Sequence, residues 1–481
     1  MAGNGAGNGA GKRAEQAAYE VVAKLRSAGY QAYYAGGCVR DLLLGQEPAD
    51  FDVATDAQPE IVLDMFPRTF AVGAHFGVVL VAAEESGREI VTEVATFRSD
   101  GAYSDGRRPD QVSFSASAEA DVQRRDFTIN GMLLDPLRLA HPLDTVKPGE
   151  MASAVLDFVG GREDLALRLV RAIGNPHTRF TEDKLRMLRA VRFAARFGFD
   201  IEAGTMAAIR EQAAEIVQVS RERIRDELTR MLTEGHARRA FELLNSTALL
   251  QWVLPEIVRM HGVEQPPQFH PEGDVWIHTL LLLEKLEAGC TPTLAWGALL
   301  HDVGKPATFR RAPDRIRFDG HVEVGVKIAE DICRRLRFSN EDTAQIVALV
   351  ANHMRFGDVE KMKDSTLKRF FRLPRFEEHL ALHRLDCLSS HGGLQLYDYA
   401  RQRYASMPSE AVRPRLLVTG RELIAAGYRP GESFKEMLRM AEDAQLEGRI
   451  HTPEEGLELV RQHFPQSPTA GRSPSLPRQS S

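Results

Sequence analysis

Two aspartates that stand two residues apart, Asp50 and Asp52, are the side chains of this sequence best suited to hold a metal ion. They come at the start of an expected extended segment, and residues two apart on a strand face the same side. Both carboxylates could therefore bind one divalent metal cluster while Phe51 packs behind them. Hard oxygen ligands of this kind suit Mg²⁺, and Mg²⁺ beside a triphosphate supports phosphoryl or nucleotidyl transfer.

Features suited to phosphate binding come just before the aspartates. Residues 33–35 read as a strand that runs into Gly36-Gly37, and residues 39–44 carry apolar side chains at helical spacing. Paired glycines let backbone N–H groups approach a ligand closely at the start of a helix, where the dipole favours anions. Arg40 adds a forked charge that matches phosphate oxygens. We therefore predict that Gly37 and Arg40 contact phosphates.

The whole stretch YYAGGCVRDLLLGQEPADFDVATD, residues 33–56, resembles the head-domain signature of the class II nucleotidyltransferases. That family includes the CCA-adding tRNA nucleotidyltransferases and the bacterial poly(A) polymerases. The resemblance implies that Asp50 and Asp52 are catalytic and hold Mg²⁺. Glu93, in the strand-like segment 90–97, is a candidate third carboxylate on the neighbouring strand, and a solvent-facing glutamate on an edge strand is the alternative.

Two later stretches resemble parts of the same family. RSDGAYSDGRRP, residues 98–109, reads either as a plain hairpin connection or as the mobile loop that CCA-adding enzymes use in the switch from adding C to adding A. RRDFTIN, residues 124–130, resembles the motif that contacts the nucleotide sugar and triphosphate. The resemblance implies that Arg125 and Asn130 bind the nucleotide and that Asp126 orients arginines.

A third match, EDKLRMLRAVRF at residues 182–193, resembles the family's nucleotide-selecting motif. On one helix, polar side chains would fall three apart beside an apolar stripe, at Asp183, Arg186, Arg189 and Arg192. Without the resemblance, this stripe would be read as a solvated arginine face. The carboxylate of Asp183 can accept from the amino group of cytosine or adenine while Arg186 donates to the adjacent ring nitrogen. Uracil and guanine mismatch both contacts, at roughly 1–3 kcal/mol each. Arg189 and Arg192 would hold phosphates or the geometry of the stripe.

A second metal-type pattern lies between residues 270 and 390. Its members are histidines and aspartates, namely His278, His301, Asp302, His321, His353 and Asp386. Their order around HDVGK resembles the HD phosphohydrolase superfamily, in which such residues bind one or two divalent metals. Imidazole and carboxylate favour a transition-metal ion over Mg²⁺ alone, and a metal-bound water would be the nucleophile. The resemblance leaves open a domain that hydrolyses phosphoesters and one that only supports RNA.

These residues need several domains to position them. At 481 residues the chain should hold about three. The resemblance implies an α/β head with a mixed sheet and helices, followed by a mostly α-helical neck, an HD body and a tail. The expected divisions are a flexible tail at 1–13, the head at 14–150, the helical neck at 151–260, the HD domain at 261–390, a helical region at 391–465 and a disordered Ser/Pro-rich tail at 466–481. Within the head we expect helices at 14–28 and 59–66 and strands at 77–82 and 90–97.

Composition limits the class of protein. The net charge of −6 means that nucleic-acid binding would need local basic patches, which makes a non-catalytic RNA-binding protein the weakest interpretation. Four widely spaced cysteines without a C-x-x-C pair disfavour a zinc knuckle or a disulfide framework and indicate a reducing cytoplasm. No apolar run approaches the ~20 residues of a membrane span.

The resemblance thus implies a template-independent enzyme that adds or repairs the 3′-terminal CCA of tRNA with CTP and ATP, binding the 3′ end and acceptor arm. A poly(A) polymerase, or an enzyme that adds only CC or only A, would carry the same head residues. An HD-type phosphohydrolase whose head only binds RNA or nucleotide is the alternative from another class. The sequence specifies no oligomeric state.

Overall fold

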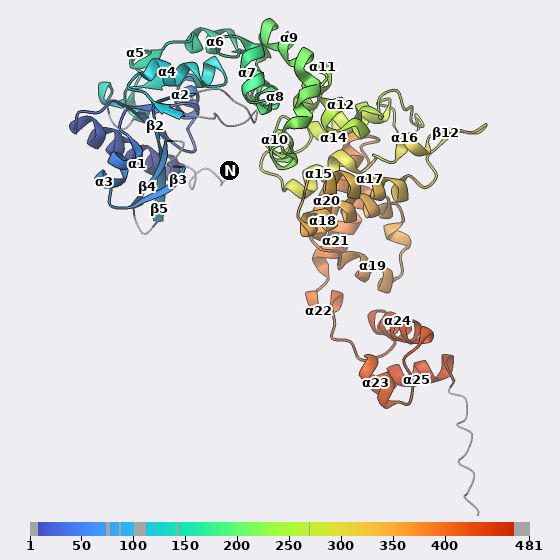
Figure 1. Cartoon of the computed structure of the whole chain (residues 1–481). Helices are drawn as coiled ribbons and strands as arrows, with labels where there is room; N and C mark the ends of the chain where they lie inside the picture. The colour runs from blue at the N-terminus through green and yellow to red at the C-terminus, as the bar shows by residue number, and fades with distance from the viewer. Residues whose placement is uncertain are drawn as a thin grey trace, which may run out of the picture.

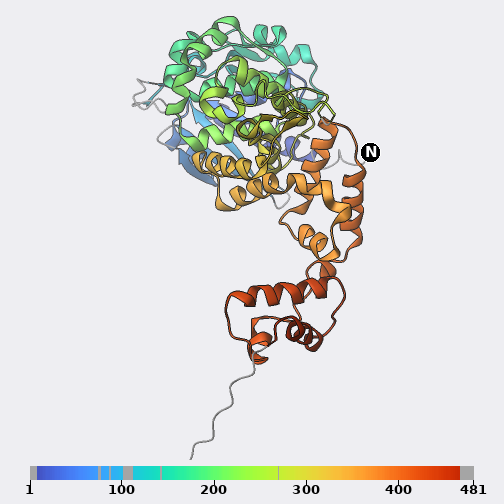
Figure 2. The same ribbon diagram turned by 90° about the vertical axis from the view of Figure 1, so that its right-hand side faces the viewer.

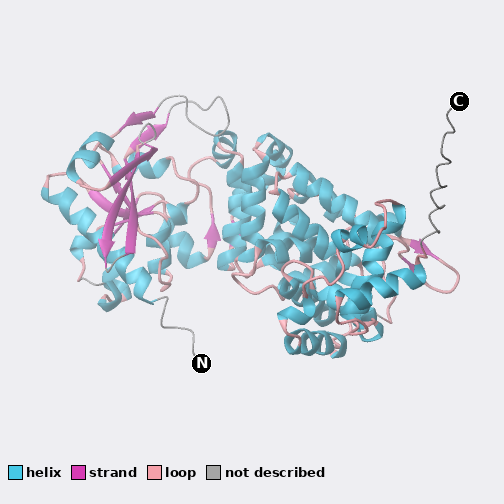
Figure 3. Cartoon of the chain, turned by 90° about the horizontal axis from the view of Figure 1, so that it is seen from below, coloured by secondary structure: helices cyan, strands magenta, loops and turns pink. Residues whose placement is uncertain are grey.

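The computed structural model describes residues 8–73, 77–85, 88–100, 112–140, 143–268 and 270–465. The chain runs from a head that contains a sheet through a helical neck and body (Figures 1 and 3), and it ends in a small helical unit at the far end (Figure 1). This arrangement confirms the predicted fold class. Most of the predicted loop at 98–109 and the predicted tail at 466–481 lie outside the described residues. No helix among the described residues is long and apolar enough to cross a membrane.

The head is built on a mixed sheet in the order β3-β4-β5-β2-β1-β8-β9. Its strands are β1 (Ala32–Ala35), β2 (Asp52–Thr55), β3 (Thr69–Gly73), β4 (Val78–Glu85), β5 (Arg88–Thr96), β8 (Met132–Leu134) and β9 (Val155–Asp157). β2 pairs with β5 in parallel, and the other neighbours are antiparallel. β6 (Arg98–Asp100) pairs separately with β7 (Val112–Phe114). The pairing of β2 with β5 places Asp52, at the start of β2, beside Glu93, in the middle of β5, at the predicted metal site.

Helices cover the sheet and join its strands. They are α1 (Asn8–Ser27), α2 (Gly37–Leu43), α3 (Pro59–Met65) and α4 (Ala118–Gln123). α1 buries Ala18, Val22 and Leu25 at helical spacing and packs against β1 and β5. It begins at Asn8, so the predicted flexible tail at 1–13 is wrong from residue 8 onward. The Gly/Asn composition suggested a linker, but the segment continues the same helix.

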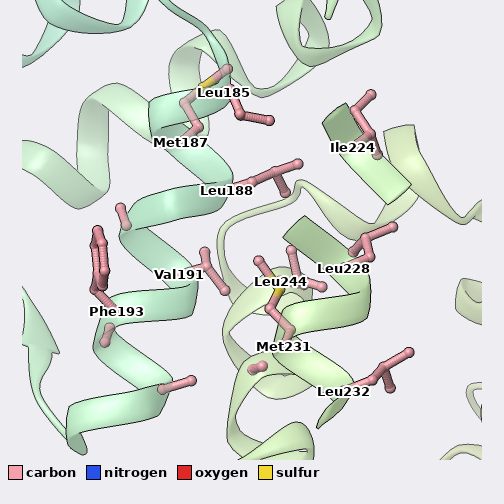
Figure 4. Close-up of a cluster of buried hydrophobic side chains, with 14 of the residues drawn as sticks. Leu185, Met187, Leu188, Val191, Phe193, Ile224, Leu228, Met231, Leu232 and Leu244 are labelled. Atoms are coloured by element: carbon pink, nitrogen blue, oxygen red, sulfur yellow. The ribbon is translucent and has the colours of Figure 1, made fainter. Parts of the chain in front are cut away.

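α5 (Pro148–Ser153) leads into β9 of the head sheet, so the predicted head boundary at residue 150 lies too early. The mostly helical neck follows with α6 (Gly161–Leu167), α7 (Pro176–Glu182), α8 (Leu185–Phe197), α9 (Ala203–Gln212), α10 (Arg221–Thr233) and α11 (Ala237–Ser246). Figure 4 shows Leu188 and Val191 of α8 facing Leu228 and Met231 of α10. This apolar contact fixes the helix that carries the predicted selection motif.

The body packs α14 (Val275–Glu284), α15 (Pro292–Leu300), α17 (His321–Arg335), α18 (Asn340–Asn352) and α20 (Phe376–Ser389) around a shared core. Beyond it, α23 (Gly420–Ala425), α24 (Glu432–Leu446) and α25 (Pro453–His463) form a separate cluster at the end remote from the head (Figure 2). Arg369 and Arg372, on and just after α19 (Asp364–Phe371), join the two units through ion pairs with Glu442.

Candidate active site and a second metal-type centre

Asp50, Asp52 and Glu93 lie near one another where the start of β2 runs beside the middle of β5. Asp50 precedes β2, Asp52 opens it, and Glu93 lies on the parallel neighbour β5. Burial raises the pKa of Asp52 to about 7, with further contributions from the charges of Glu93 and Asp50, while Arg125 opposes the shift. Burial and Asp50 also raise the pKa of Glu93. Carboxylates that disfavour each other's ionisation at one spot form a site for a cation.

The glycine turn before α2 has a conformation that other residues rarely adopt. Gly36 has φ 73° and ψ −127°, and a Cβ atom there would lie 3.1 Å from Nη1 of Arg125. Four residues later, the side chain of Arg40 is almost fully buried. It donates to Asp41 at 2.8 Å and to Oδ1 of Asn130 at 2.5 Å, and it lies 4.5 Å from the ring centroid of Phe197. The turn and the arginine are therefore both held rigidly at the cavity.

Two buried aspartates hold the other arginines in place. Asp121, on α4, binds Arg124 at 2.6 Å through one carboxylate oxygen and Arg125 at 3.0 Å through the other. Asp126 accepts two hydrogen bonds from Arg189, at 2.8 and 2.7 Å. The charge of Arg189 and the hydrogen bonds outweigh burial and lower the pKa of Asp126 to about 2. Both carboxylates are thus ionised partners that orient arginines.

Asp183 does not lie on the same helix as Arg186, so that part of the predicted stripe is wrong. Its backbone is extended, with φ −143° and ψ 103°, and it separates α7 from α8. Its carboxylate accepts the N–H of Leu185 at 3.1 Å and pairs with Arg223 of α10 at 2.7 Å. The break in the helix turns Asp183 toward the cavity, whereas a continuous helix would have aligned it with the arginines.

The three arginines of the stripe have different surroundings. Arg186 donates to Glu182 at 2.8 Å and to the backbone oxygen of Arg124 at 2.9 Å. Arg189 reaches Asp126, as described above. Arg192 is buried against Glu227 of α10 at 2.7 Å and does not line the cavity. Two roles were predicted for Arg192, a phosphate contact and the maintenance of the geometry of the arginine stripe. Its buried position against Glu227 is compatible with the second role and not with the first.

One cavity of about 550 Å³ collects most of the predicted head residues. Its lining residues are Gly36, Gly37, Arg40, Asp50, Asp52, Arg124, Arg125, Asp126, Asn130, Asp183, Arg186, Arg189, Phe193 and Arg230. Glu93 lines an adjoining cavity of about 270 Å³, together with Asp52, Arg98, Arg124 and Arg125. Asp52 is therefore shared by the two spaces.

Sequence reasoning missed several residues that build this site. Asp121 stands three and four residues before the arginines it binds, a helical spacing that could have indicated the pairing. Glu182 stands inside the selection motif and pairs with Arg186. Arg223 and Arg230 lie about 40 residues farther along the chain, and no local pattern connects them with Asp183 or the cavity.

All six predicted HD residues converge in the body. Nε2 of His278 lies 3.2 Å from Nε2 of His301 and 3.2 Å from a carboxylate oxygen of Asp386. Asp302 lies 3.2 Å from His301 through one oxygen, and 4.0 and 3.8 Å from Nε2 of His321 and His353 through the other. They form two groups that could each hold an ion, His278–His301–Asp386 and Asp302–His321–His353.

The nitrogen atoms of the second group fit metal coordination. Nε2 of His321 and Nε2 of His353 are buried and have no hydrogen-bond partner among the described residues. Burial lowers the pKa of His353 to about 4, which favours the neutral imidazole that a metal requires. A cavity of about 360 Å³ opens onto this group and is also lined by His270, Lys305 and Phe318. The donor set therefore suits a divalent ion next to a space for a ligand.

Three family models match the chain. Residues 32–171 match the poly A polymerase head domain, residues 198–260 match the probable RNA and SrmB-binding site of polymerase A, and residues 275–389 match the HD domain. The head and HD matches imply a divalent metal, and the histidine and aspartate groups of the body could hold one.

Curated relatives and a solved structure agree with these matches. The chain is 40% identical to the CCA-adding enzyme of Geobacillus thermodenitrificans (strain NG80-2), over 49% of this chain and 53% of that protein. It is 36% identical to the CCA-adding enzyme of Streptococcus mutans serotype c, over 62% of this chain and 67% of that protein. The chain thus spans about half the length of the first of these relatives and two thirds of the second. The crystal structure of the Bacillus stearothermophilus CCA-adding enzyme in complex with CTP superposes with a TM-score of 0.70 at 26% identity, covering 94% of this chain and 98% of that one.

Proposed function

The chain belongs to the family of the CCA-adding enzymes, and from this membership we propose that it adds or repairs the 3′-terminal CCA of tRNA. It would use CTP and ATP, release pyrophosphate and need no nucleic-acid template. The observation that carries the proposal is a single cavity with three kinds of group. Carboxylates suited to metal ions, arginines suited to phosphates and the Asp183–Arg186 pair suited to a base all line it.

Asp50 and Asp52 would hold the metal ions, with Glu93 as a third carboxylate. The donor set of carboxylate oxygens fits Mg²⁺, and a cation would offset the burial and like charges that raise the pKa of Asp52 to about 7. When bound, Mg²⁺ activates the RNA 3′-hydroxyl and neutralises charge on the departing pyrophosphate. The protein's own part is to hold these oxygens at the start of β2 and on the adjacent strand β5.

The triphosphate would lie against the backbone of Gly37 and the guanidinium groups of Arg40 and Arg125. Asn130 and Arg189 would complete this wall. Because Asp121 and Asp126 already orient Arg125 and Arg189, these cations are positioned before a nucleotide binds. Binding then orders few side chains, which preserves affinity and aligns the α-phosphate for attack.

Base selection would rest on Asp183 and Arg186. The carboxylate accepts from the amino group of cytosine or adenine, and the guanidinium donates to the neighbouring ring nitrogen. Uracil or guanine would leave both groups mismatched, at roughly 1–3 kcal/mol each. Protein side chains thus replace a nucleic-acid template.

The acceptor would be the 3′ end and acceptor arm of tRNA. Support comes from the match of residues 198–260 to an RNA-binding model in the neck that borders the cavity.

The four cysteines, all free thiols, support a cytoplasmic location, where thiols stay reduced.

The test is an extension assay on tRNA that lacks its last three nucleotides, with Mg²⁺ and CTP alone, ATP alone or both. We expect two added residues with CTP and a third only when ATP is also present. A long ladder with ATP alone would identify a poly(A) polymerase instead. A product that ends after two added nucleotides when both triphosphates are present would identify a CC-adding enzyme. The absence of any extended product under all three conditions would refute nucleotide transfer.

A second candidate function lies in the body, where we propose a transition-metal centre that hydrolyses phosphoesters. The observation that favours it is the convergence of all six HD residues, with two buried histidine nitrogens that lack a partner. Lys305, 2.7 Å from Asp302, could bind a phosphate in the adjoining cavity. Hydrolysis of bis(p-nitrophenyl) phosphate with added Co²⁺, lost on the substitution H321A, is the expected result. Equal rates in both proteins would refute it.

A further inference from the structure

Glu272 is not one of the six HD residues, yet its carboxylate holds one of them. Oε1 of Glu272 lies 2.7 Å from Nδ1 of His278 and 2.9 Å from Nδ1 of His270. An ionised carboxylate only accepts hydrogen bonds, so both nitrogens must donate. The side chain of His278 is fully buried and that of Glu272 is 7% exposed, so water does not compete for this contact.

This hydrogen bond decides which nitrogen of His278 is free. With the proton on Nδ1, the lone pair lies on Nε2. Nε2 is the atom that faces His301 and Asp386, at 3.2 Å from each. A carboxylate behind a histidine in this way fixes the ring and makes its other nitrogen a stronger metal ligand.

The other three histidines of the centre are oriented differently. Their Nδ1 atoms contact backbone oxygens, at 2.9 Å from Ala298 for His301, 2.9 Å from Phe318 for His321 and 2.7 Å from Val350 for His353. Those partners belong to the main chain and persist in any side-chain variant. Within the described residues, His278 is therefore the HD histidine whose orientation rests on a carboxylate.

We propose that Glu272 is the positioning residue of the His278–His301–Asp386 group and sets the metal affinity of that half of the centre. This inference rests on the proposed transition-metal centre in the body. His270 donates to the same oxygen of Glu272 and so holds the carboxylate against His278. Because that oxygen already receives two N–H groups, we assign the cluster His270–Glu272–His278 to the support of its neighbour.

The test measures Co²⁺ binding to the full chain by equilibrium dialysis and by visible absorption of the bound ion. All variants carry the substitutions D50N and D52N, which remove the carboxylate pair of the head from the measurement. E272A should weaken one binding step by about 10–100-fold and leave the other unchanged. E272Q should lose less, because its amide oxygen still accepts from Nδ1. E264A is the matched control. Glu264 precedes Glu272 in the same segment, and its carboxylate is exposed and paired with Arg311.

Each other outcome overturns a definite part of the inference. Equal Co²⁺ affinity in E272A and E264A would refute the role of Glu272 alone. Absence of Co²⁺ binding in the D50N, D52N parent would refute the metal centre on which the role rests. A loss in H270A as large as that in E272A, with a changed absorption spectrum, would mean that His270 is itself a ligand. If circular dichroism shows that E272A does not fold, the comparison of E272Q with E264A decides.

Discussion

At the scale of single residues, the carboxylate to which we assign base selection is held by a side chain outside the selection motif. Arg223 pairs with Asp183 at 2.7 Å, and Asp183 also caps the start of α8 through the N–H of Leu185. The carboxylate that we assign to the base is therefore fixed from two sides. The fixed orientation of this carboxylate matters because the amino group of cytosine or adenine must donate to an oxygen in one defined position. A carboxylate free to rotate would not offer that position.

We predict that R223A reduces discrimination against UTP. Without the ion pair the Asp183 carboxylate can rotate, so kcat/KM for CTP should fall roughly tenfold, which corresponds to about 1.4 kcal/mol. The ratio of CTP to UTP incorporation should fall with it. The measurement is single-nucleotide extension with each triphosphate. R221A, on the first turn of the same helix, is the control, and an equal loss in both variants would contradict the prediction.

Gly36 offers a second residue-scale test. In G36A, the positive φ should cost about 1–3 kcal/mol of stability, and the new methyl group would press on Arg125 at 3.1 Å. We expect a higher KM for CTP because Arg125 shifts. Gly45 also has a positive φ but has no atom within 4 Å of a built Cβ. G45A should thus lose similar stability, read as a lower melting temperature, and keep its KM. Similar KM values in both variants would show that Arg125 is unaffected.

At the scale of elements, α10 supports the selection helix. Its apolar side packs on α8, and Glu227 of α10 forms a buried ion pair with Arg192. The same helix reaches the body, because Thr229 accepts a hydrogen bond from Trp296 of α15 at 2.9 Å. α10 thus joins the nucleotide cavity to the HD body, together with α11, which packs on both α8 and α14.

We predict that E227A destabilises the neck by about 3 kcal/mol, since it removes the nearer carboxylate from the buried Arg192 and leaves only Glu234, 3.7 Å away, as its ion-pair partner among the described residues. Urea unfolding followed by circular dichroism should show the loss as a lower midpoint. The exposed pair of Arg238 and Glu242 provides the control, because E242A should change stability by less than about 1 kcal/mol. A midpoint in E227A equal to that in E242A would mean that Arg192 finds water or another partner.

At the scale of the whole molecule, two separate metal-type centres lie in different parts of the chain. One lies at the sheet of the head and the other among the helices of the body, with the neck between them (Figures 1 and 3). The two centres use different donors, carboxylates in the head and mainly imidazoles in the body, so they should prefer different ions.

We therefore predict that the two centres can be disabled independently. D52N should abolish nucleotide addition and retain Co²⁺ binding in the body. H321A should weaken Co²⁺ binding and retain nucleotide addition. Parallel extension and Co²⁺ dialysis assays on both variants check this. Loss of nucleotide addition in a folded H321A protein would mean that the body centre acts on the head.

Much of the local structure could be predicted because it depends on neighbours in sequence. The strand, glycine turn and helix before Asp50, the strand that carries Glu93 and the order of the HD residues all follow from periodicity, turn residues and family motifs. Membership of the nucleotidyltransferase family also follows from those motifs and is confirmed. The Gly/Asn-rich start of α1 was the local exception, since its composition suggested a linker.

Contacts between distant residues were decided only by the tertiary structure. The pairing of β2 with β5 unites Glu93 with Asp52, and α10 brings Arg223 to Asp183 across 40 residues of chain. The burial of Arg192 likewise results from packing against α10, and the helix break at Asp183 appeared only in the structure. The sequence determined which chemical groups are present and the local elements that carry them. Their partners, burial and orientation depend on which elements pack together, because electrostatic and hydrogen-bond contacts act over a few ångströms of space and not along the chain.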